Sequence, residues 1–453
     1  MNKKLFILIS GDAIFSVIAL FSGSLLRFGS SVQKAYLFDL KGLKVYTFMV
    51  ILLFSSHLLE IYDYEKYSGK KEILIRISIV LVVSFMLLSA VFYLIPGLII
   101  GRGWLILSLA GFGLFQFLWH VGYRLCLNIP ALAKRVLIVG TGSLANKIGG
   151  LIAATNHQHV LSGYINCSNE PAHVPLHHIL NNESGLIETV KKEKANKIVI
   201  SLSERRGVFP AKDLLSCKLN GIEVVDAPSF YEEITGKLLI ENMPPSCLIF
   251  SDGFRKTYFQ CIFKRVFDIS FAVIGVIIVL PFVPIIALLI KIDSPGPVLF
   301  RQARIGEGEK EFMLYKFRTM RQDAENKTGA VWAQENDPRI TTAGKFLRKS
   351  RMDEIPQLFN VLKGEMSFVG PRPERPEIIK KLEEMIPYYA ERHTVKPGIT
   401  GWAQVKYSYG ASVEDAKEKL RYDLFYIKHS SLFLDLLIIL ETIKVVLFGR
   451  GGR

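Results

Sequence analysis

Four long apolar stretches in the first 127 residues constrain this chain more than any other feature. They cover roughly residues 5–26, 43–62, 73–95 and 104–127. A helix rises about 1.5 Å per residue and a hydrocarbon core is ~30 Å thick, so each stretch is about long enough to cross a bilayer. The second stretch is the most interrupted, with His57 and Glu60 near its end. The sequence therefore predicts a four-helix transmembrane domain over residues 1–130.

Basic residues flank these stretches in a pattern that indicates their orientation. They precede the first stretch, separate the second from the third and follow the fourth: Lys3, Lys4, Lys66, Lys70, Lys71, Arg76, Lys134 and Arg135. Such residues collect on the cytoplasmic side of membrane proteins, although Lys34, Lys41 and Lys44 oppose the bias. The first 21 residues resemble a signal peptide but lack a small-residue cleavage site, so we expect them to be a retained span.

Composition excludes several classes of protein. Half of the 453 residues are hydrophobic and 21% are charged, while the net charge is +15. This balance is too apolar for an ordinary soluble enzyme and suits a lipid bilayer with anionic headgroups or phosphorylated substrates. We expect no nucleic-acid partner, because the chain has no recognisable nucleic-acid-binding motif. The five scattered cysteines form no CxxC pair, so we expect reduced thiols, without a disulfide framework or a cysteine zinc site.

Residues 131–250 have the pattern of an α/β domain. The segment "RVLIVGTGSLANKIGG" at 135–150 reads as strand, glycine turn and helix, and further strand-like runs lie at 161–166, 197–202 and 222–226. Strands that alternate with helices predict a parallel, Rossmann-like sheet. The turn Gly140-x-Gly142-x-x-Ala145 suits a dinucleotide phosphate, but the second strand ends near Asn166 instead of an acidic ribose ligand. We therefore favour a degenerate, structural or regulatory domain, similar to CoA-binding domains, over an NAD site.

Residues 255–453 begin with a basic approach and an unbroken apolar run from Phe271 to Ile290, which contains Pro281 and Pro284. Each proline removes a backbone donor and obstructs the preceding helical turn. A kinked transmembrane helix would account for the run. However, basic residues flank both of its ends, which indicates that both ends are cytoplasmic. We therefore predict a re-entrant helix over 266–291 that breaks at the prolines and returns to the side from which it entered.

Two adjacent carboxylates stand out in "SRMDEIPQLFNVLKGEMSFVGPRPERPE", residues 350–377. Pro356 favours a first-turn position, which would place Asp353 and Glu354 at a helix N-terminus. One reading is that Asp353 only caps this helix. The other is catalytic: one carboxylate attacks phosphorus, and its neighbour holds Mg²⁺. The spacing alone leaves both readings open.

Several cations in the same region favour phosphoryl chemistry. Lys316, Arg318 and Arg321 lie in "YKFRTMR", where alternation can place cations on one face. Arg339 follows in "NDPRIT", and Arg348 and Arg351 precede the carboxylates. Pro371 and Pro373 flank Arg372 and restrict the backbone that carries it, so this loop is a candidate phosphate clamp. The alternative for isolated lysines and arginines is a solvated basic face.

The motifs "SPGPVLFRQARIG", "YKFRTM", "NDPRIT", "MDEIPQLFNVLKGEMSFVGPRP" and "HTVKPGITGWAQV" occur in order within roughly residues 260–449. In this the chain resembles the bacterial polyprenyl-phosphate glycosyl-1-phosphate transferases, which begin exopolysaccharide, capsule and O-antigen synthesis. Four spans and a degenerate Rossmann-like domain before the motifs are similar to the large members of that family. The resemblance implies a mostly helical catalytic domain over 255–453 with a small β element. It also implies location in the bacterial inner membrane, with this domain facing the cytoplasm.

The resemblance further implies a reaction and a set of site residues. Family members transfer sugar 1-phosphate from a nucleotide diphosphate sugar, usually a UDP-sugar, to undecaprenyl phosphate and release UMP. Asp353 corresponds to the nucleophile, and Glu354 to its partner and Mg²⁺ ligand. Substrate binding is implied for Lys316, Arg318, Arg339, Pro371, Arg372 and Pro373. The family's helix break is Ser-Pro in small members, whereas this chain has Leu280-Pro281, which puts any role of the serine hydroxyl in doubt.

Two other functions compete with this interpretation. An NAD-dependent nucleotide-sugar oxidoreductase or dehydratase would use the 131–250 domain, and a non-enzymatic polysaccharide-assembly scaffold would use it as a sensor. The final apolar run, 432–448, is interrupted by charged residues and suits an interfacial helix better than a span. We expect Tyr422, Phe425 and Tyr426 to pack in a core. The sequence leaves open the sugar, the polysaccharide, the ligand of the 131–250 domain and homo-oligomer formation.

Overall fold

The computed structural model describes residues 3–29, 42–59, 61–62, 70–127, 133–154, 159–167, 171–181, 185–202, 209–241, 253–254, 257–321, 337, 339–407, 410 and 412–447. The chain divides into two compact units, Met1–Ala227 and Pro228–Arg453. The first unit contains the N-terminal helices and the parallel sheet, and the second contains the Asp353–Glu354 pair.

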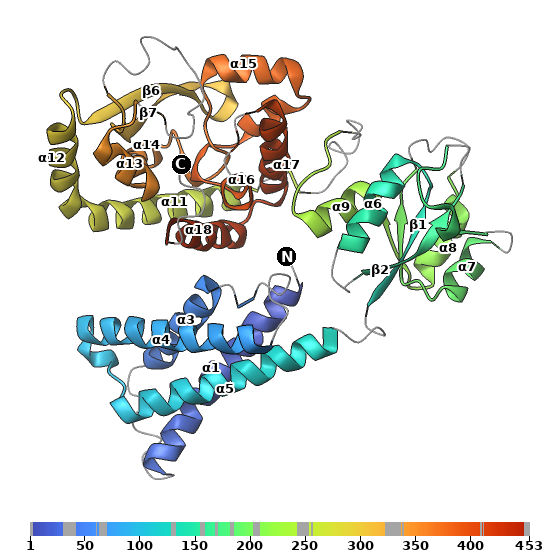
Figure 1. Ribbon diagram of the computed structural model, residues 1–453, viewed down its shortest axis with the longest axis horizontal. Helices are drawn as coiled ribbons and strands as arrows, with labels where there is room; N and C mark the ends of the chain where they lie inside the picture. The colour runs from blue at the N-terminus through green and yellow to red at the C-terminus, as the bar shows by residue number, and fades with distance from the viewer. Residues whose placement is uncertain are drawn as a thin grey trace. The chain divides into compact units, whose positions relative to one another are not determined.

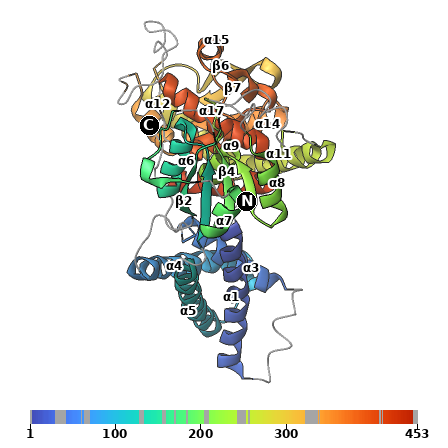
Figure 2. The same cartoon turned by 90° about the vertical axis from the view of Figure 1, so that its right-hand side faces the viewer.

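Apolar helices fill the N-terminal part, as predicted. They are α1 (Lys3–Phe28), α3 (Leu43–Leu58), α4 (Lys70–Leu94) and α5 (Arg102–Leu127), with a short turn of 3₁₀ helix, η2 (Pro96–Leu98). Both ribbon views show α1 and α5 side by side (Figures 1 and 2). Segments of α1, α4 and α5 are long and apolar enough to cross a membrane, whereas α3 is shorter and ends before the predicted 43–62 stretch does.

A buried carboxylate lies within this apolar bundle. Asp12 Oδ2 accepts hydrogen bonds from the Tyr62 hydroxyl at 2.9 Å and from Gln116 Nε2 at 2.7 Å, and His120 Nε2 lies 3.2 Å from it. An ionisable side chain among apolar helices is costly unless it is partnered. These contacts therefore tie α1 and α5 to the segment that follows α3.

The α/β part of the first unit contains a fully parallel five-stranded sheet with strand order β3-β2-β1-β4-β5. Its strands are β1 (Lys134–Val139), β2 (His159–Ile165), β3 (Ile179–Leu180), β4 (Lys197–Ile200) and β5 (Glu223–Asp226). Between them lie α6 (Ser143–Ala154), η4 (Leu176–His178), α7 (Leu186–Lys192) and α8 (Ala211–Leu219). The sequence missed β3, which is only two residues long and carries no periodic signal. The α/β prediction is confirmed.

The described residues of the second unit form two small sheets and a set of helices. Its strands are β6 (Leu299–Ile305) and β7 (Glu311–Phe317), which are antiparallel, and β8 (Ser367–Val369) and β9 (Gly398–Thr400), which are parallel. Its α-helices after residue 300 are α13 (Thr342–Lys349), α14 (Gln357–Lys363), α15 (Pro376–Met385), α16 (Trp402–Lys406), α17 (Val413–His429) and α18 (Leu432–Leu447). Short 3₁₀ segments are η6 (Glu307–Glu309), η7 (Met352–Glu354) and η8 (Tyr389–Thr394).

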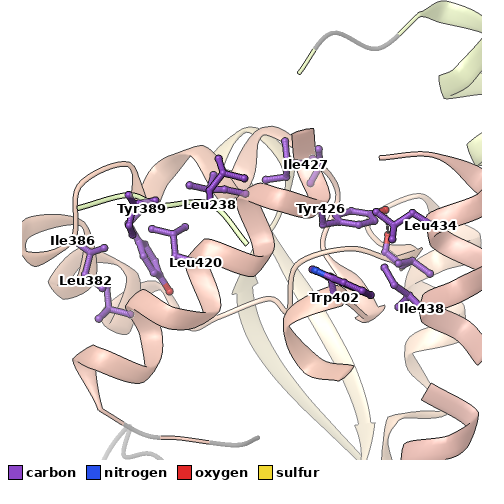
Figure 3. Close-up of a cluster of buried hydrophobic side chains, with 14 of the residues drawn as sticks. Leu238, Leu382, Ile386, Tyr389, Trp402, Leu420, Tyr426, Ile427, Leu434 and Ile438 are labelled. Atoms are coloured by element: carbon purple, nitrogen blue, oxygen red, sulfur yellow. Dashed lines mark hydrogen bonds between the residues drawn. The ribbon is translucent and has the colours of Figure 1, made fainter. Parts of the chain in front are cut away.

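The largest core of the second unit also contains residues that precede 255. Figure 3 shows Leu238 beside Leu420 and Tyr389, and Ile240 belongs to the same buried cluster. Trp402 Nε1 donates to the Gly236 carbonyl at 2.8 Å, and Leu238 N donates to the Arg421 carbonyl at 3.1 Å. The segment that follows α9 (Ala227–Thr235) is thus part of this unit's core.

The predicted helix break is present. Helix α11 (Tyr258–Val279) ends at η5 (Leu280–Phe282), and α12 (Val283–Asp293) follows in a different direction (Figure 1). Pro281 and Pro284 occupy the first turns of η5 and α12, where a missing N–H has no helical partner to lose. The helix begins at Tyr258, earlier than predicted, because Thr257 and Gln260 form a capping box.

Candidate active site

The two carboxylates lie in η7, between α13 and α14. Asp353 and Glu354 are each only 7% exposed. Arg351, which precedes this turn, has a φ of 57°, in the left-handed region that a non-glycine residue rarely adopts. Such local strain persists only where the surroundings impose it, and it is common at functional sites. The turn is therefore held in one conformation by its neighbours.

Helix α14, which follows the carboxylates, is held by hydrogen bonds to two other elements, α11 and β7. Arg265 of α11 donates to the carbonyls of Val361 and Leu362 at 2.7 and 2.9 Å, which satisfies acceptors in the last turn of α14. The side chain of Asn360 binds the backbone of β7, accepting from Tyr315 N at 3.2 Å and donating to the Met313 carbonyl at 2.8 Å. The broken helix and the β6–β7 hairpin therefore position the carboxylate turn.

Three cations surround one oxygen of Glu354. Arg372 Nη2 lies 2.6 Å from Glu354 Oε1, Lys316 Nζ 3.5 Å and Arg351 Nη1 3.6 Å. Burial alone would raise the pKa of Glu354, but the charges of Arg372 and then Lys316 hold this pKa well below its usual range. Glu354 is therefore an anion at every physiological pH.

Asp353 differs from its neighbour. Burial raises the pKa of Asp353 above its ordinary value, and the negative charge of Glu354 raises it further. Among the described residues, none donates a side-chain hydrogen bond to this carboxylate. Lys316, on β7, completes the group: burial lowers its pKa to about 8, although the charge of Glu354 opposes that shift. Asp353 is thus the less engaged of the two carboxylates and is available to a ligand.

The loop that carries Arg372 is held through its backbone carbonyls. Gly398 N donates to the Pro371 carbonyl at 2.9 Å, Arg392 Nη2 to the Arg372 carbonyl at 3.0 Å and Arg304 Nη1 to the Pro373 carbonyl at 3.0 Å. The two flanking prolines restrict the same backbone. The Arg372 guanidinium therefore has little freedom to leave Glu354.

Arg392 is itself held by buried partners. It donates to Asp423 Oδ2 at 2.8 Å and to the Tyr389 hydroxyl at 2.6 Å, and all three residues are buried. Sequence reasoning missed this group, because its members lie in η8 and α17, away from the motif they support. The only signal for it was the position of Arg392 just before "HTVKPGITGWAQV".

The other predicted binding residues lie in different places. Arg318 follows β7, and its guanidinium donates to the carbonyls of Pro295 and Ser294 at 2.8 and 2.6 Å. Arg339 pairs with Asp337, with Nη2 2.5 Å from Oδ2. Arg348 Nε donates to Thr319 Oγ1 at 2.9 Å. The structure thus brings Lys316, Arg351 and Arg372 to Glu354, whereas Arg318 fixes the end of α12 and its following turn.

The oxygen donors of the pair fit a hard divalent cation. Glu354 engages its cations through Oε1, and none of the described side chains hydrogen-bonds to its Oε2. Mg²⁺ prefers carboxylate oxygens and keeps several waters, so one or two protein ligands are enough for it. Glu354 and the adjacent Asp353 therefore form a donor set that can hold Mg²⁺ together with a substrate phosphate.

Comparisons with known proteins match this region. Residues 259–449 fit the model of the family described as "Bacterial sugar transferase". An exopolysaccharide production protein PSS of Rhizobium leguminosarum bv. phaseoli is 43% identical over 196 residues, which are 42% of this chain and 98% of that protein. A UDP-N-acetylgalactosamine-undecaprenyl-phosphate N-acetylgalactosaminephosphotransferase of Aeromonas hydrophila is 43% identical over 240 residues.

A third relative is a UDP-glucose:undecaprenyl-phosphate glucose-1-phosphate transferase of Xanthomonas campestris pv. campestris, 47% identical over 195 residues. The match to the Xanthomonas protein covers 43% of this chain and 40% of that protein. The match to the Aeromonas protein covers 53% of this chain and 56% of that protein. The chain therefore spans about half the length of these larger relatives, and the shared part is the one that contains the Asp353–Glu354 pair.

Proposed function

Because this chain belongs to the bacterial sugar transferase family, we propose that it transfers a sugar 1-phosphate from a UDP-sugar to undecaprenyl phosphate. The observation that carries this proposal is the buried Asp353–Glu354 pair, with Lys316, Arg351 and Arg372 within 3.6 Å of Glu354. Such a concentration of cations suits a substrate with two phosphate groups. The names of the Aeromonas and Xanthomonas relatives, which specify UDP-sugars and undecaprenyl phosphate, support the choice of donor and acceptor.

In the first step, an Asp353 carboxylate oxygen attacks the β-phosphorus of the UDP-sugar. The bond between that phosphorus and the bridging oxygen breaks, UMP leaves with the electron pair, and an acyl-phosphate joins the sugar phosphate to Asp353. The lack of hydrogen bonds to Asp353 supports this role, because none of the described side chains occupies its carboxylate oxygens. Burial of the carboxylate excludes water that would hydrolyse the intermediate.

In the second step, a phosphate oxygen of undecaprenyl phosphate attacks the same phosphorus. The acyl-phosphate bond breaks, which restores the Asp353 carboxylate and leaves the sugar on a lipid diphosphate. Arg372 is held by its backbone and donates to Glu354 through Nη2, and its planar guanidinium suits a group that stabilises charge on transferring phosphate oxygens. Bound Mg²⁺ would supply further charge neutralisation at these oxygens, and Glu354 with Asp353 would hold it.

The surface of the broken helix supports a membrane location for this reaction. Much of α11, η5 and α12 is apolar and exposed, as at Phe259 (71%), Ile277 (64%) and Ile292 (74%). An apolar surface of this extent needs cover by lipid or protein. We propose that the segment re-enters the cytoplasmic leaflet of the bacterial inner membrane and returns. The nucleophile would then stay at the headgroup level, where the acceptor phosphate meets a cytosolic donor.

A screen of donors tests the function. Full-length protein in lipid nanodiscs with undecaprenyl phosphate and Mg²⁺ is offered a panel of UDP-sugars, and UMP release is measured. We expect one sugar, or a small related group, to release UMP in step with formation of a sugar-diphosphate lipid. No UMP from any donor would contradict the proposal and favour the scaffold function.

Cysteine labelling tests re-entry. Single cysteines on both sides of residues 266–291, in an otherwise thiol-free variant, are expected to react only with reagents that reach the cytoplasm. Periplasmic reactivity at residue 295 or beyond would show a full crossing. Replacing Pro281 and Pro284 together with Ala is expected to favour such a crossing, because both prolines then cease to interrupt the helix.

A further inference from the structure

Three ligand-type side chains meet at the end of the β6–β7 hairpin. Glu309 lies in η6, the turn of the hairpin, Glu383 in α15 and His393 in η8. One ligand atom from each residue lies within 4.8 Å of the others. Segments distant in the sequence thus place two carboxylates and an imidazole around one point. None of these residues belongs to the group that binds Glu354.

His393 is the most informative member of this cluster. It is 7% exposed, and its Nδ1 is buried without a hydrogen-bond partner among the described residues. The same atom lies 4.0 Å from Glu383 Oε1, too far for a hydrogen bond. A buried polar atom normally has a partner, and leaving one unpaired costs free energy. A cation between the imidazole and the carboxylates would give it one.

The charges of the cluster are also unbalanced. Within the described parts of the chain, Glu309 has no ion pair, and the only ion-pair partner of Glu383 is His393. Burial and then the charge of Glu309 raise the pKa of Glu383, while burial and the charge of Arg392 lower the pKa of His393 to about 4. A neutral imidazole beside two carboxylates is a typical ligand set for a divalent metal ion.

We propose that Glu309, Glu383 and His393 form a second metal site, separate from the Asp353–Glu354 pair, that takes a divalent transition metal of the Zn²⁺ type. A mixed nitrogen and oxygen ligand set favours Zn²⁺ over Mg²⁺, which prefers oxygen ligands alone. Three protein ligands leave a fourth position for water. The site is independent of the proposed sugar transfer and does not require it.

Such a metal would act on the structure around the carboxylate pair. It would join the hairpin turn to η8, and His393 follows Arg392, the residue that donates to the Arg372 carbonyl. The hairpin itself carries Arg304, which donates to the Pro373 carbonyl. The metal would therefore be a clip between two supports of the Pro371–Pro373 loop, and its ligands are positioning residues.

Metal uptake by the full-length protein in detergent tests this site. After chelator treatment, Zn²⁺ is added in the presence of excess Mg²⁺, and bound zinc is counted after desalting. We expect about one Zn²⁺ per chain for the wild type, in line with a single three-ligand site. Glu309→Gln and Glu383→Gln are expected to weaken Zn²⁺ binding at least tenfold. Because Glu309 is exposed, its variant removes a ligand without disturbing the core.

Two control variants separate this site from other acidic groups. Glu384→Gln changes the exposed neighbour of Glu383 on the same helix, and Glu354→Gln changes the proposed Mg²⁺ ligand. Both are expected to keep wild-type Zn²⁺ uptake. Co²⁺ added in place of Zn²⁺ should give visible absorption bands that Glu309→Gln alters. The proposal fails if the wild type binds no Zn²⁺, if Glu309→Gln and Glu383→Gln bind it as the wild type does, or if Glu354→Gln abolishes uptake.

Discussion

The turn after β1 and the turn before α14 follow the same local plan, yet among the described residues only the second turn has buried carboxylates paired with cations. Each is a short turn that leads directly into a helix. At the first, Thr141 and Ser143 are uncharged, and Asn166 stands at the end of β2 where an acidic ribose ligand is expected. At the second, two buried carboxylates meet three cations. A turn motif therefore predicts a site only when charged residues from other parts of the chain meet at it.

The glycines of the two regions also serve packing in different ways. Gly140 has a φ of 123°, and a Cβ there would lie 2.6 Å from the Ser201 carbonyl oxygen of the neighbouring chain segment. Gly370, at the start of the Arg372 loop, approaches the Lys396 carbonyl oxygen so closely that a Cβ would lie 2.4 Å away. The first glycine lets the turn after β1 pass close to Ser201, which follows β4. The second lets the Arg372 loop pack against β9.

Substitution of Asp353 should reduce activity more than any other change. Asp353→Asn should lower sugar transfer by at least about 10³-fold, because the amide keeps the shape of the carboxylate but is a poor nucleophile. The thermal midpoint should stay the same or rise, since a buried charge beside Glu354 is removed. UMP release and a melting curve on the same sample measure both. A rate loss of similar size in a Gly142→Ala variant that folds would show that the turn after β1 is as important for transfer as the turn before α14.

The next effect is at Arg372. Arg372→Lys keeps the charge near Glu354 but loses the planar fork, so we expect a rate loss of about 10²-fold. Arg318→Lys is the matched control, because Arg318 binds the Ser294 and Pro295 carbonyls and not Glu354. Arg318→Lys should mainly lower the thermal stability of the protein. Equal rate losses in folded samples of both variants would show that Arg372 has no special role.

Two truncated fragments test where the catalytic part of the chain begins. Residues 255–453 contain all the proposed chemistry and are expected to retain measurable transfer in lipid, but they lack Leu238 and Ile240, which are buried in the core. Burial of two aliphatic side chains contributes about 3–6 kcal/mol, so the 255–453 fragment should melt roughly 10 °C below a 228–453 fragment. Equal melting temperatures of the two fragments would mean that the 228–241 segment adds no stability to the core. A 228–453 fragment that folds but has no activity would mean that residues of the first unit contribute to the site.

The smallest effect on activity is expected at the glycine turn. Gly140→Ala should destabilise the α/β domain by about 1–3 kcal/mol, because its backbone conformation excludes a side chain. Sugar transfer by the folded fraction should stay within about twofold, because all the residues of the proposed chemistry belong to the second unit. Purified protein should also show no bound NAD by ultraviolet absorbance. Bound NAD, or a large loss of transfer in Gly140→Ala, would favour the oxidoreductase alternative.

The sequence predicted those parts of the fold that depend on local pattern. Apolar length predicted the N-terminal helices, strand alternation predicted the parallel sheet, and two prolines predicted the break at Leu280–Phe282. The helix start at Tyr258 was missed, because the capping box of Thr257 and Gln260 lies inside a stretch that reads as a basic linker.

The candidate site was predictable where its residues share a motif. Asp353, Glu354 and Arg372 are close in the sequence, and Lys316 is part of a basic strand. The supports of these residues were not predictable. Arg265 binds the end of α14 from a helix almost a hundred residues earlier, and Arg392 and Asp423 meet only in the folded chain. Single-sequence patterns carry no signal for contacts of this range.

Intact-mass analysis of the protein can detect the proposed covalent intermediate on Asp353. The protein is mixed with the active UDP-sugar and Mg²⁺, without undecaprenyl phosphate, and its intact mass is recorded with peptide mapping. We predict a mass increase of one sugar phosphate on the peptide that contains Asp353, with release of UMP and no increase in Asp353→Asn. Transfer to lipid by purified Asp353→Asn at the wild-type rate, or an adduct on another residue, would contradict the account.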